Sequence, residues 1–233
     1  MAVELIPVTI EGETGLDVRV HRQEATVSDL IAAMQLPADD PKILKPFHKQ
    51  RYAVCRGCVN NCCKYNPIVI DLVAAERLAR HHSLNLMQFA RQYLALTPDL
   101  PYPELRRRPC PFLRQNCCTV YEARALICRL YLCTPMTTRL EKLRCAVLLA
   151  GEAALQQRLV ELGVAPRSWQ PTQLMAALKH SYRAGKLTPE AYRREREQLD
   201  LLLERNPFLD GCDYDEVCLR QCCTEDLWQT IFG

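Results

Sequence analysis

The sequence predicts a mainly α-helical fold of the α+β class. It indicates a small N-terminal β-hairpin plus helix, then a cysteine-rich metal module, then a helical C-terminal region. Three observations support this. Apolar residues alternate near the N-terminus, they recur at helical spacing over much of the remainder, and 14 of the 233 residues are cysteines. We expect a scaffold at 1–40, a metal-binding domain at 50–138 and a helical region at 139–233 that ends in a further cysteine cluster.

Residues 5–20 alternate between apolar and polar side chains around the turn Glu-Gly-Glu-Thr-Gly, which is typical of a β-hairpin. We expect Ser28 to cap the helix that follows, and Pro37 to come after the end of that helix. The hairpin and the segment TVSDLIAAMQLP resemble the opening of small β-grasp domains. This resemblance implies a β-grasp-like scaffold at the N-terminus.

Helix starts are marked along the middle of the chain. Asp71 predicts the N-cap of a helix over 72–82, and Asn85 with a glutamine three residues later predicts a near-capping box for the next helix. Five prolines in the segment TPDLPYPELRRRPCP exclude regular structure there.

The C-terminal half favours two or three amphipathic helices over 139–162 and 173–204. We expect Gly151 and Gly163 to interrupt them, and Thr188 followed by proline to start one. These helices are the predicted surface for a protein partner.

Composition limits the other partners. A net charge of +3 is too small to indicate nucleic-acid binding. No stretch approaches the roughly 18 apolar residues of a membrane span. The N-terminal residues lack the basic and apolar regions of a secretory signal. We therefore expect a cytoplasmic protein with no nucleic-acid partner and no membrane partner.

Reduced thiols in the cytoplasm favour metal binding over disulfides. The vicinal pairs Cys62-Cys63, Cys117-Cys118 and Cys222-Cys223 point the same way, because two adjacent cysteines close a strained ring when they bond to each other. Cys145 stands apart from every cluster on an apolar helical stripe, so we expect it in the core.

The remaining cysteines form three clusters. Gaps of two residues between thiols, as in the first cluster, are typical of zinc knuckles and of iron–sulfur sites. The third cluster repeats the Cys-x3-Cys-Cys ending of the first, and it either forms a second site or completes the first one. The candidate metal ligands are Cys55, Cys58, Cys62, Cys63, Cys110, Cys118, Cys128, Cys133, Cys212, Cys218, Cys222 and Cys223.

The metal itself is predicted from the donor type. None of the five histidines sits at ligand spacing within a cluster, so the candidates are a four-cysteine zinc site and an iron–sulfur cluster. The first two clusters together offer more thiols than one zinc ion needs. This surplus favours an iron–sulfur cluster of the 4Fe-4S type, with zinc as the alternative.

Three motifs occur in order: CRGCVNNCC at 55–63, CPFL at 110–113 and CTVYEARALICRLY at 118–131. Together they resemble the YkgJ-type cysteine cluster family, the CxxCxxCC zinc- or iron-chelating domains, over roughly residues 52–135. The resemblance implies metal binding through Cys55, Cys58, Cys62, Cys63, Cys110, Cys118 and Cys128.

Two departures from the family pattern matter. Cys117 and Cys133 exceed its usual cysteine set, and Arg124-Ala125 replaces its usual Arg-Pro. One branch of the family resembles flagellin lysine methylases, which implies a cluster-dependent group-transfer enzyme as a further alternative.

Arg124 and Arg129 lie inside the last motif. In one interpretation their positive charge lies near an anionic thiolate cluster, stabilises it and raises its potential. In the other, both make ordinary salt bridges and Tyr121 belongs to the core.

The sequence has no Gly-rich nucleotide loop, P-loop or Cys-x3-Cys-x2-Cys signature. It therefore predicts a metal-binding protein with a redox, electron-transfer or cofactor role, and alternatively a zinc-stabilised interaction module, with no catalytic residue assigned.

Overall fold

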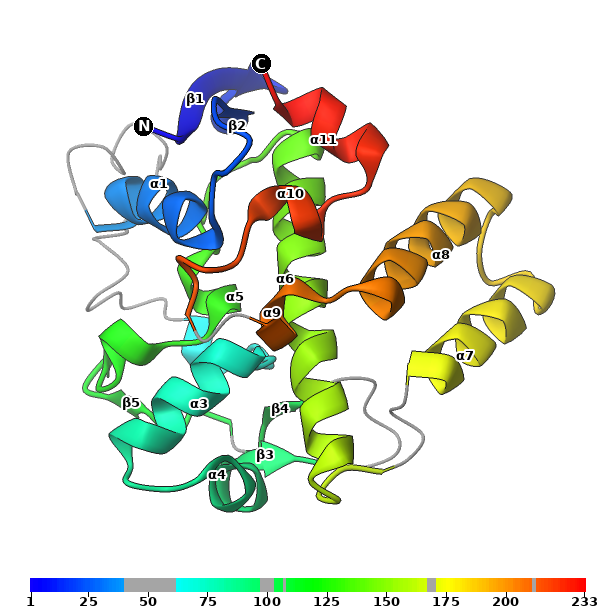
Figure 1. Ribbon diagram of the computed structural model, residues 1–233. Helices are drawn as coiled ribbons and strands as arrows, with labels where there is room; N and C mark the ends of the chain where they lie inside the picture. Colours follow the sequence, from blue (N-terminus) through cyan, green and yellow to red (C-terminus); the bar gives the residue numbers. More distant parts are fainter. Residues whose placement is uncertain (40–61, 97–102, 107, 167–170, 211–212) are drawn as a thin grey trace.

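The structure is a computed structural model of the chain that describes residues 1–39, 62–96, 103–106, 108–166, 171–210 and 213–233 (Figure 1). Its helices are α1 (Val27–Asp39), α3 (Leu72–His81), α4 (Leu86–Tyr93), α5 (Leu126–Arg129), α6 (Thr138–Glu161), α7 (Pro171–Arg183), α8 (Pro189–Glu204), α9 (Pro207–Asp210), α10 (Leu219–Cys222) and α11 (Glu225–Ile231). Two 3₁₀ turns are η1 (Cys62–Lys64) and η2 (Tyr121–Ala123).

The described strands pair antiparallel in three two-stranded sheets. They are β1 (Val3–Ile10) with β2 (Glu13–Val20), β3 (Leu94–Ala95) with β4 (Glu104–Leu105), and β5 (Leu113–Arg114) with β6 (Cys117–Cys118). Helices dominate, so the predicted mainly α class with a small N-terminal hairpin is confirmed. Among the described residues, no helix is both long enough and apolar enough to cross a membrane.

The N-terminal hairpin has a tighter turn than the sequence predicted. Ile10 pairs with Glu13, so Glu11 and Gly12 alone form the turn, with φ values of 50° and 81°. Two successive positive φ values give the backbone twist that matches the strands of a hairpin. The five-residue turn of the sequence prediction is therefore wrong in length, although the hairpin itself is confirmed.

Helix α1 begins earlier than predicted. The backbone N–H of Thr26 donates to Asp29 Oδ2 at 2.9 Å, and the N–H of Asp29 donates to Thr26 Oγ1 at 3.3 Å. This reciprocal pair makes Thr26, rather than Ser28, the capping residue. Pro37 lies in the last turn of α1 and not beyond it, because a proline there removes one hydrogen bond without breaking the turns before it.

Other predicted helix starts are confirmed. Asp71 caps α3 by accepting from the N–H of Ala74 at 2.9 Å. Asn85 and Gln88 form a complete capping box at α4. Thr188 caps α8. The described part of the proline-rich segment includes β4, which pairs with β3, so the prediction of no regular structure there was wrong.

Helix α6 is the long helix that runs through the middle of the molecule (Figure 1), and it contacts α3, α5 and α9 as well as β2, α10 and α11. Gly151 lies within it and does not interrupt it. A Cβ at Gly151 would lie 2.7 Å from the Cβ of Asp71 and 3.3 Å from the ring of Phe208. The glycine therefore serves close packing, whereas Gly163, with φ of 66°, follows the end of the helix as predicted.

Cys145 lies on the exposed side of α6, so the prediction that it belongs to the core was wrong. Its thiol contacts Glu141 Oε1 at 3.9 Å, whereas the next two residues along the helix are buried. A run of apolar residues longer than the buried stripe of a helix leaves some of them on the outer face.

The C-terminal segment packs against the N-terminal hairpin and α1. The N–H of Val27 donates to the carbonyl of Val217, and the N–H of Leu219 donates to the carbonyl of Ala25, both at 2.8 Å. Helices α7 and α8 form a pair that projects from the body on the other side (Figure 1), with the rings of Tyr182 and Tyr192 stacked at 4.3 Å. The three predicted regions remain a prediction, and the first and third are in contact.

A buried carboxylate, Asp71, joins three distant segments. It is 2% exposed. Its Oδ1 accepts from the Ala74 N–H and from the Tyr214 hydroxyl, both at 2.9 Å, and its Oδ2 accepts from the N–H of Leu126 at 2.8 Å. Burial raises its pKa, while the same three donors oppose that rise. The carboxylate thereby ties the starts of α3 and α5 to the C-terminal segment.

We expect Asp71→Ala to lower the free energy of unfolding by about 3–5 kcal/mol, because three buried donors lose their acceptor. Urea unfolding followed by circular dichroism measures the change. Asp213→Asn is the control: Asp213 pairs with Arg77 at a partly exposed position, so its loss should cost no more than about 1 kcal/mol. Equal losses in the two variants would contradict a special role for Asp71.

Candidate metal centre

A backbone hydrogen bond brings the first cysteine cluster to the second. Cys62 and Cys63 lie on η1, and the N–H of Cys110 donates to the carbonyl of Cys63 at 2.8 Å. The thiols of Cys62 and Cys63 also hydrogen-bond to each other. This bond lowers the pKa of Cys62 and raises that of Cys63, so Cys62 is the first of the pair to ionise.

The β5–β6 hairpin presents the vicinal pair of the second cluster. Gln115 and Asn116 form its two-residue turn, with φ values of 48° and 63°. Successive side chains on a strand point to opposite faces. Accordingly, Cys117 is exposed and Cys118 is half-buried.

Helix α5 carries Cys128. The helix starts at the N–H of Leu126, which Asp71 holds, and Cys128 lies two residues later in the same turn. The buried carboxylate therefore fixes the start of the turn that carries this thiol.

The described thiols of the first two clusters act on one another electrostatically. Burial raises the pKa of Cys128, and negative charge on Cys62, Cys110 and Cys118 raises it further, whereas Arg124 lowers it. Burial likewise raises the pKa of Cys110 to about 11, with Cys118 and Cys62 adding to the effect. Thiols that are costly to ionise together become good ligands once a cation offsets their charge.

The same mutual effects identify the members of the group. Cys63 responds to Cys62, Cys128 and Cys110, which completes a set drawn from four separate segments. We call this set the central thiol group; its members are Cys62, Cys63, Cys110, Cys118 and Cys128.

Arg124 brings an incompletely paired positive charge to the central thiol group. Its side chain is 6% exposed, and its Nη2 donates to Gln35 Oε1 on α1. The guanidinium lies 3.6 Å from the centre of the Tyr121 ring. Its Nε and Nη1 are buried and have no hydrogen-bond partner in the part of the chain that the structure describes. Two unpaired donors on a buried cation fit an anionic group beside the thiols.

Arg129 has a different environment. Its Nε donates to the carbonyl of Arg124 at 3.1 Å, and its Nη2 donates to the carbonyl of Glu122. These bonds connect α5 to the backbone of η2 and the residue that follows it. The contacts of Arg129 support the loop that carries Arg124, and they favour a structural role.

Other predicted ligands lie elsewhere. Cys55, Cys58 and Cys212 fall outside the described residues. Cys133 is exposed at the surface.

Cys218, Cys222 and Cys223 form a separate group near the N-terminal hairpin. Burial raises the pKa of Cys222, and Cys223 and Cys218 raise it further.

Among the described residues, no three cysteine, histidine or acidic side chains are already arranged around a metal-sized position.

Two residues of the site were missed by sequence reasoning. The amide oxygen of Gln35 accepts from Arg124, and its amide nitrogen donates to the Tyr121 hydroxyl at 3.1 Å. Gln35 lies on helix α1, 86 positions before Tyr121, and nothing in its local sequence marks it. Asp71 was predicted only as a helix cap. Its bond to α5 joins residues 55 positions apart, for which the sequence carries no local signal.

One segment of the chain matches a known family. Residues 54–147 match the model of the CxxCxxCC family, described as a putative zinc- or iron-chelating domain. A search of curated proteins and a search of solved structures found no match. The predicted resemblance to the cysteine cluster family is thereby confirmed for this segment, which contains the whole central thiol group.

We expect Cys118→Ser to abolish most metal loading and Cys117→Ser to leave it unchanged, because the two adjacent thiols point to opposite faces of β6. Inductively coupled plasma mass spectrometry of the purified variants measures iron and zinc per chain. The matched pair controls for folding of the hairpin. Equal metal content in both variants would refute the assignment of Cys118.

Proposed function

We propose that this chain, whose residues 54–147 form a CxxCxxCC domain, binds a 4Fe-4S cluster and uses it in a redox, electron-transfer or cofactor role. The observation that supports this most is the central thiol group, in which segments far apart in sequence bring five thiols close enough to act on one another electrostatically. We also propose that the protein works in a reducing compartment such as the cytoplasm, where these thiols remain available as ligands.

The number of thiols favours one of the two candidate metals. A structural zinc ion takes four thiolates, and the central thiol group already exceeds that number before Cys55 and Cys58 are added. An iron–sulfur cluster also takes four, and it supplies one-electron chemistry when bound. We assign its ligands to the central thiol group together with Cys55 and Cys58, and the surplus favours the larger inorganic group.

Arg124 supports an anionic occupant. A buried guanidinium with unpaired donors is costly, and a thiolate-bound cluster of net negative charge would offset that cost. The contact with Gln35 and the Tyr121 ring orients the guanidinium, so its charge is already in place before any metal arrives. In this role Arg124 favours the more negative, reduced state of the cluster.

The zinc alternative makes the same thiols a structural support. In that case the projecting pair of α7 and α8 would be the functional surface and would meet a protein partner (Figure 1). The two proposals predict different contents of the same site, so one analysis separates them.

We expect protein purified without oxygen to be brown and to contain iron and acid-labile sulfide in equal amounts, because a 4Fe-4S cluster has equal numbers of both. Metal analysis, a sulfide assay and a visible spectrum of one sample measure this. Exposure to air should bleach the colour. A colourless sample that releases only zinc to a chelator would reject the cluster in favour of the zinc alternative.

We expect Arg124→Gln to lower the midpoint potential of the bound cluster, because removal of a buried positive charge destabilises the reduced form. Arg124→Lys should restore most of the difference, since it retains the charge. A redox titration followed by visible absorbance measures both. If the glutamine variant keeps the wild-type potential at full iron content, the charge of Arg124 does not act on the cluster.

A further inference from the structure

We propose that Cys218 and Cys222 form a second, independent thiol site that interconverts between a dithiol and a disulfide by exchange with a low-molecular-weight disulfide. The site lies outside residues 54–147, so it is separate from the matched domain. It does not depend on which metal the central thiol group binds.

The two cysteines stand at opposite ends of the single turn of α10. Cys218 is the residue before the helix, and Cys222 is its last residue. The thiol of Cys222 points back along the helix and donates to the carbonyl of Cys218 at 3.7 Å. Residues four apart on a helix are separated by about 6 Å along the axis, which lies within the span of about 4.4–6.8 Å that a disulfide bridges between Cα atoms. Rotation of the Cys218 side chain is the main movement that closure requires.

Cys223 is a poorer disulfide partner for Cys222 than Cys218 is. Cys223 follows Cys222 directly, so a bond between them would close a strained ring. Gln198 on α8 donates to the carbonyl of Cys222 at 2.9 Å and holds the end of α10. The pair on one helical turn is therefore the favoured combination.

Exposure assigns the two roles in the exchange. Cys218 is half-buried, whereas Cys222 is 0% exposed. The accessible thiol is the one that an external disulfide can reach, and the buried thiol is placed to resolve the mixed disulfide that results. The free thiol of Cys218 donates to the carbonyl of Gln23 at 3.5 Å, which directs it toward the surface formed by that residue.

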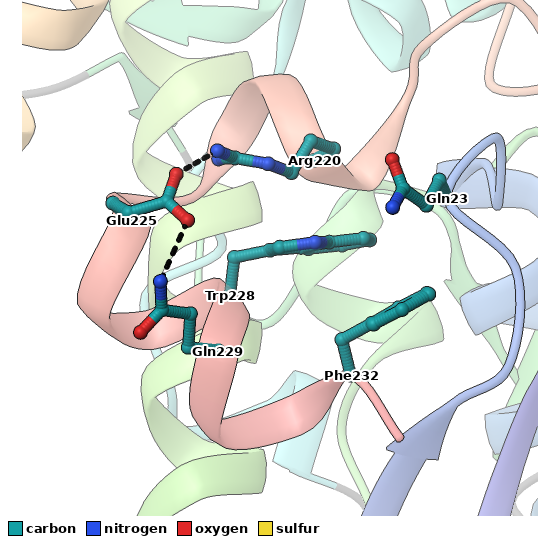
Figure 2. Close-up of a pocket in the computed structure, with 6 residues that line it drawn as sticks. All are labelled: Gln23, Arg220, Glu225, Trp228, Gln229 and Phe232. Carbon is teal, nitrogen blue, oxygen red and sulfur yellow. Dashed lines mark hydrogen bonds and ion pairs between the residues drawn. The ribbon is translucent and has the colours of Figure 1, made fainter.

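Gln23 also lines a cavity of about 390 Å³ at the junction of α10, α11 and the segment after the hairpin. In Figure 2 the guanidinium of Arg220 lies on one side of the Trp228 indole and the ring of Phe232 lies on the other. The guanidinium carbon of Arg220 lies 5.6 Å from the centre of the Trp228 ring, and the ring centres of Trp228 and Phe232 are 5.4 Å apart. The cavity gives a small disulfide a place to bind beside the segment that carries Cys218.

The exchange balances without an additional oxidant. The Cys218 thiolate attacks one sulfur of the small disulfide, forms a mixed disulfide and releases the first small thiolate. The Cys222 thiolate then attacks the Cys218 sulfur, closes the protein disulfide and releases the second. Two protein thiols lose two electrons and two protons, and the small disulfide becomes two thiols. The reverse sequence with excess small thiol restores the dithiol.

Peptide mapping tests the proposal, because trypsin cuts after Arg220 and so separates the two cysteines. The full-length reduced protein is treated with oxidised glutathione, alkylated and digested. We expect a disulfide that links the peptides 206–220 and 221–233, with Cys218 and Cys222 as the joined residues, and its loss after dithiothreitol. A bond between Cys222 and Cys223 would stay within one peptide and would overturn the assignment.

Serine variants test the order of the two steps. Cys222→Ser should accumulate glutathione on Cys218, and Cys218→Ser should lose the linked peptides. Cys223→Ser is the matched control and should behave as wild type, with circular dichroism showing that each variant folds. Absence of the link in the folded wild type overturns the proposal. So does zinc or iron that the wild-type chain carries and that Cys218→Ser alone removes, since the trio would then be a metal site.

Discussion

Most of this architecture depends on the hydrogen bonds that the buried carboxylate of Asp71 accepts. A charge in the interior is tolerable only when every part of it is hydrogen-bonded, and Asp71 accepts from an N–H of α3, from an N–H of α5 and from the Tyr214 hydroxyl. The three donors come from segments that lie far apart in the sequence. Gly151 allows this meeting point to lie directly against the central helix α6. The position of Cys128 follows, because its helix begins at this carboxylate.

The central thiol group is built from short elements that could not hold their shape alone. A 3₁₀ turn, a two-residue β-ladder and a four-residue helix carry its thiols. Hydrogen bonds to neighbouring segments hold them, such as the bond from the Cys110 N–H to the Cys63 carbonyl and the bond from the Leu126 N–H to Asp71. Elements this short gain little from their own hydrogen bonding, so their geometry depends on tertiary contacts. The ligand positions therefore belong to the fold as a whole.

The sequence predicted those features that depend on residues close together in the chain. Asp71, Asn85 and Thr188 mark helix starts because a cap and its helix are adjacent in sequence. The cysteine motifs were recognisable for the same reason, since their spacing is short.

Long-range contacts explain the features that the sequence did not predict. Gly151 reads as a helix break, and its role in packing depends on Asp71, which lies 80 positions earlier. Cys145 reads as a core residue, and its exposure depends on which face of α6 its neighbours cover. The sequence allowed two roles for Arg124. The unpaired donors that distinguish these roles are visible only in the folded structure.

The contact between Gln35 and Arg124 joins the N-terminal helix α1 to the loop beside the thiols. Binding free energies are reciprocal: if an anionic group at the thiols favours one orientation of Arg124, the same orientation favours α1 in its docked position by an equal amount. Helix α1 leads directly into the segment that contains Cys55 and Cys58. Under the proposed function, occupancy of the centre and anchoring of the N-terminal helix would therefore be thermodynamically linked through the contact between Gln35 and Arg124.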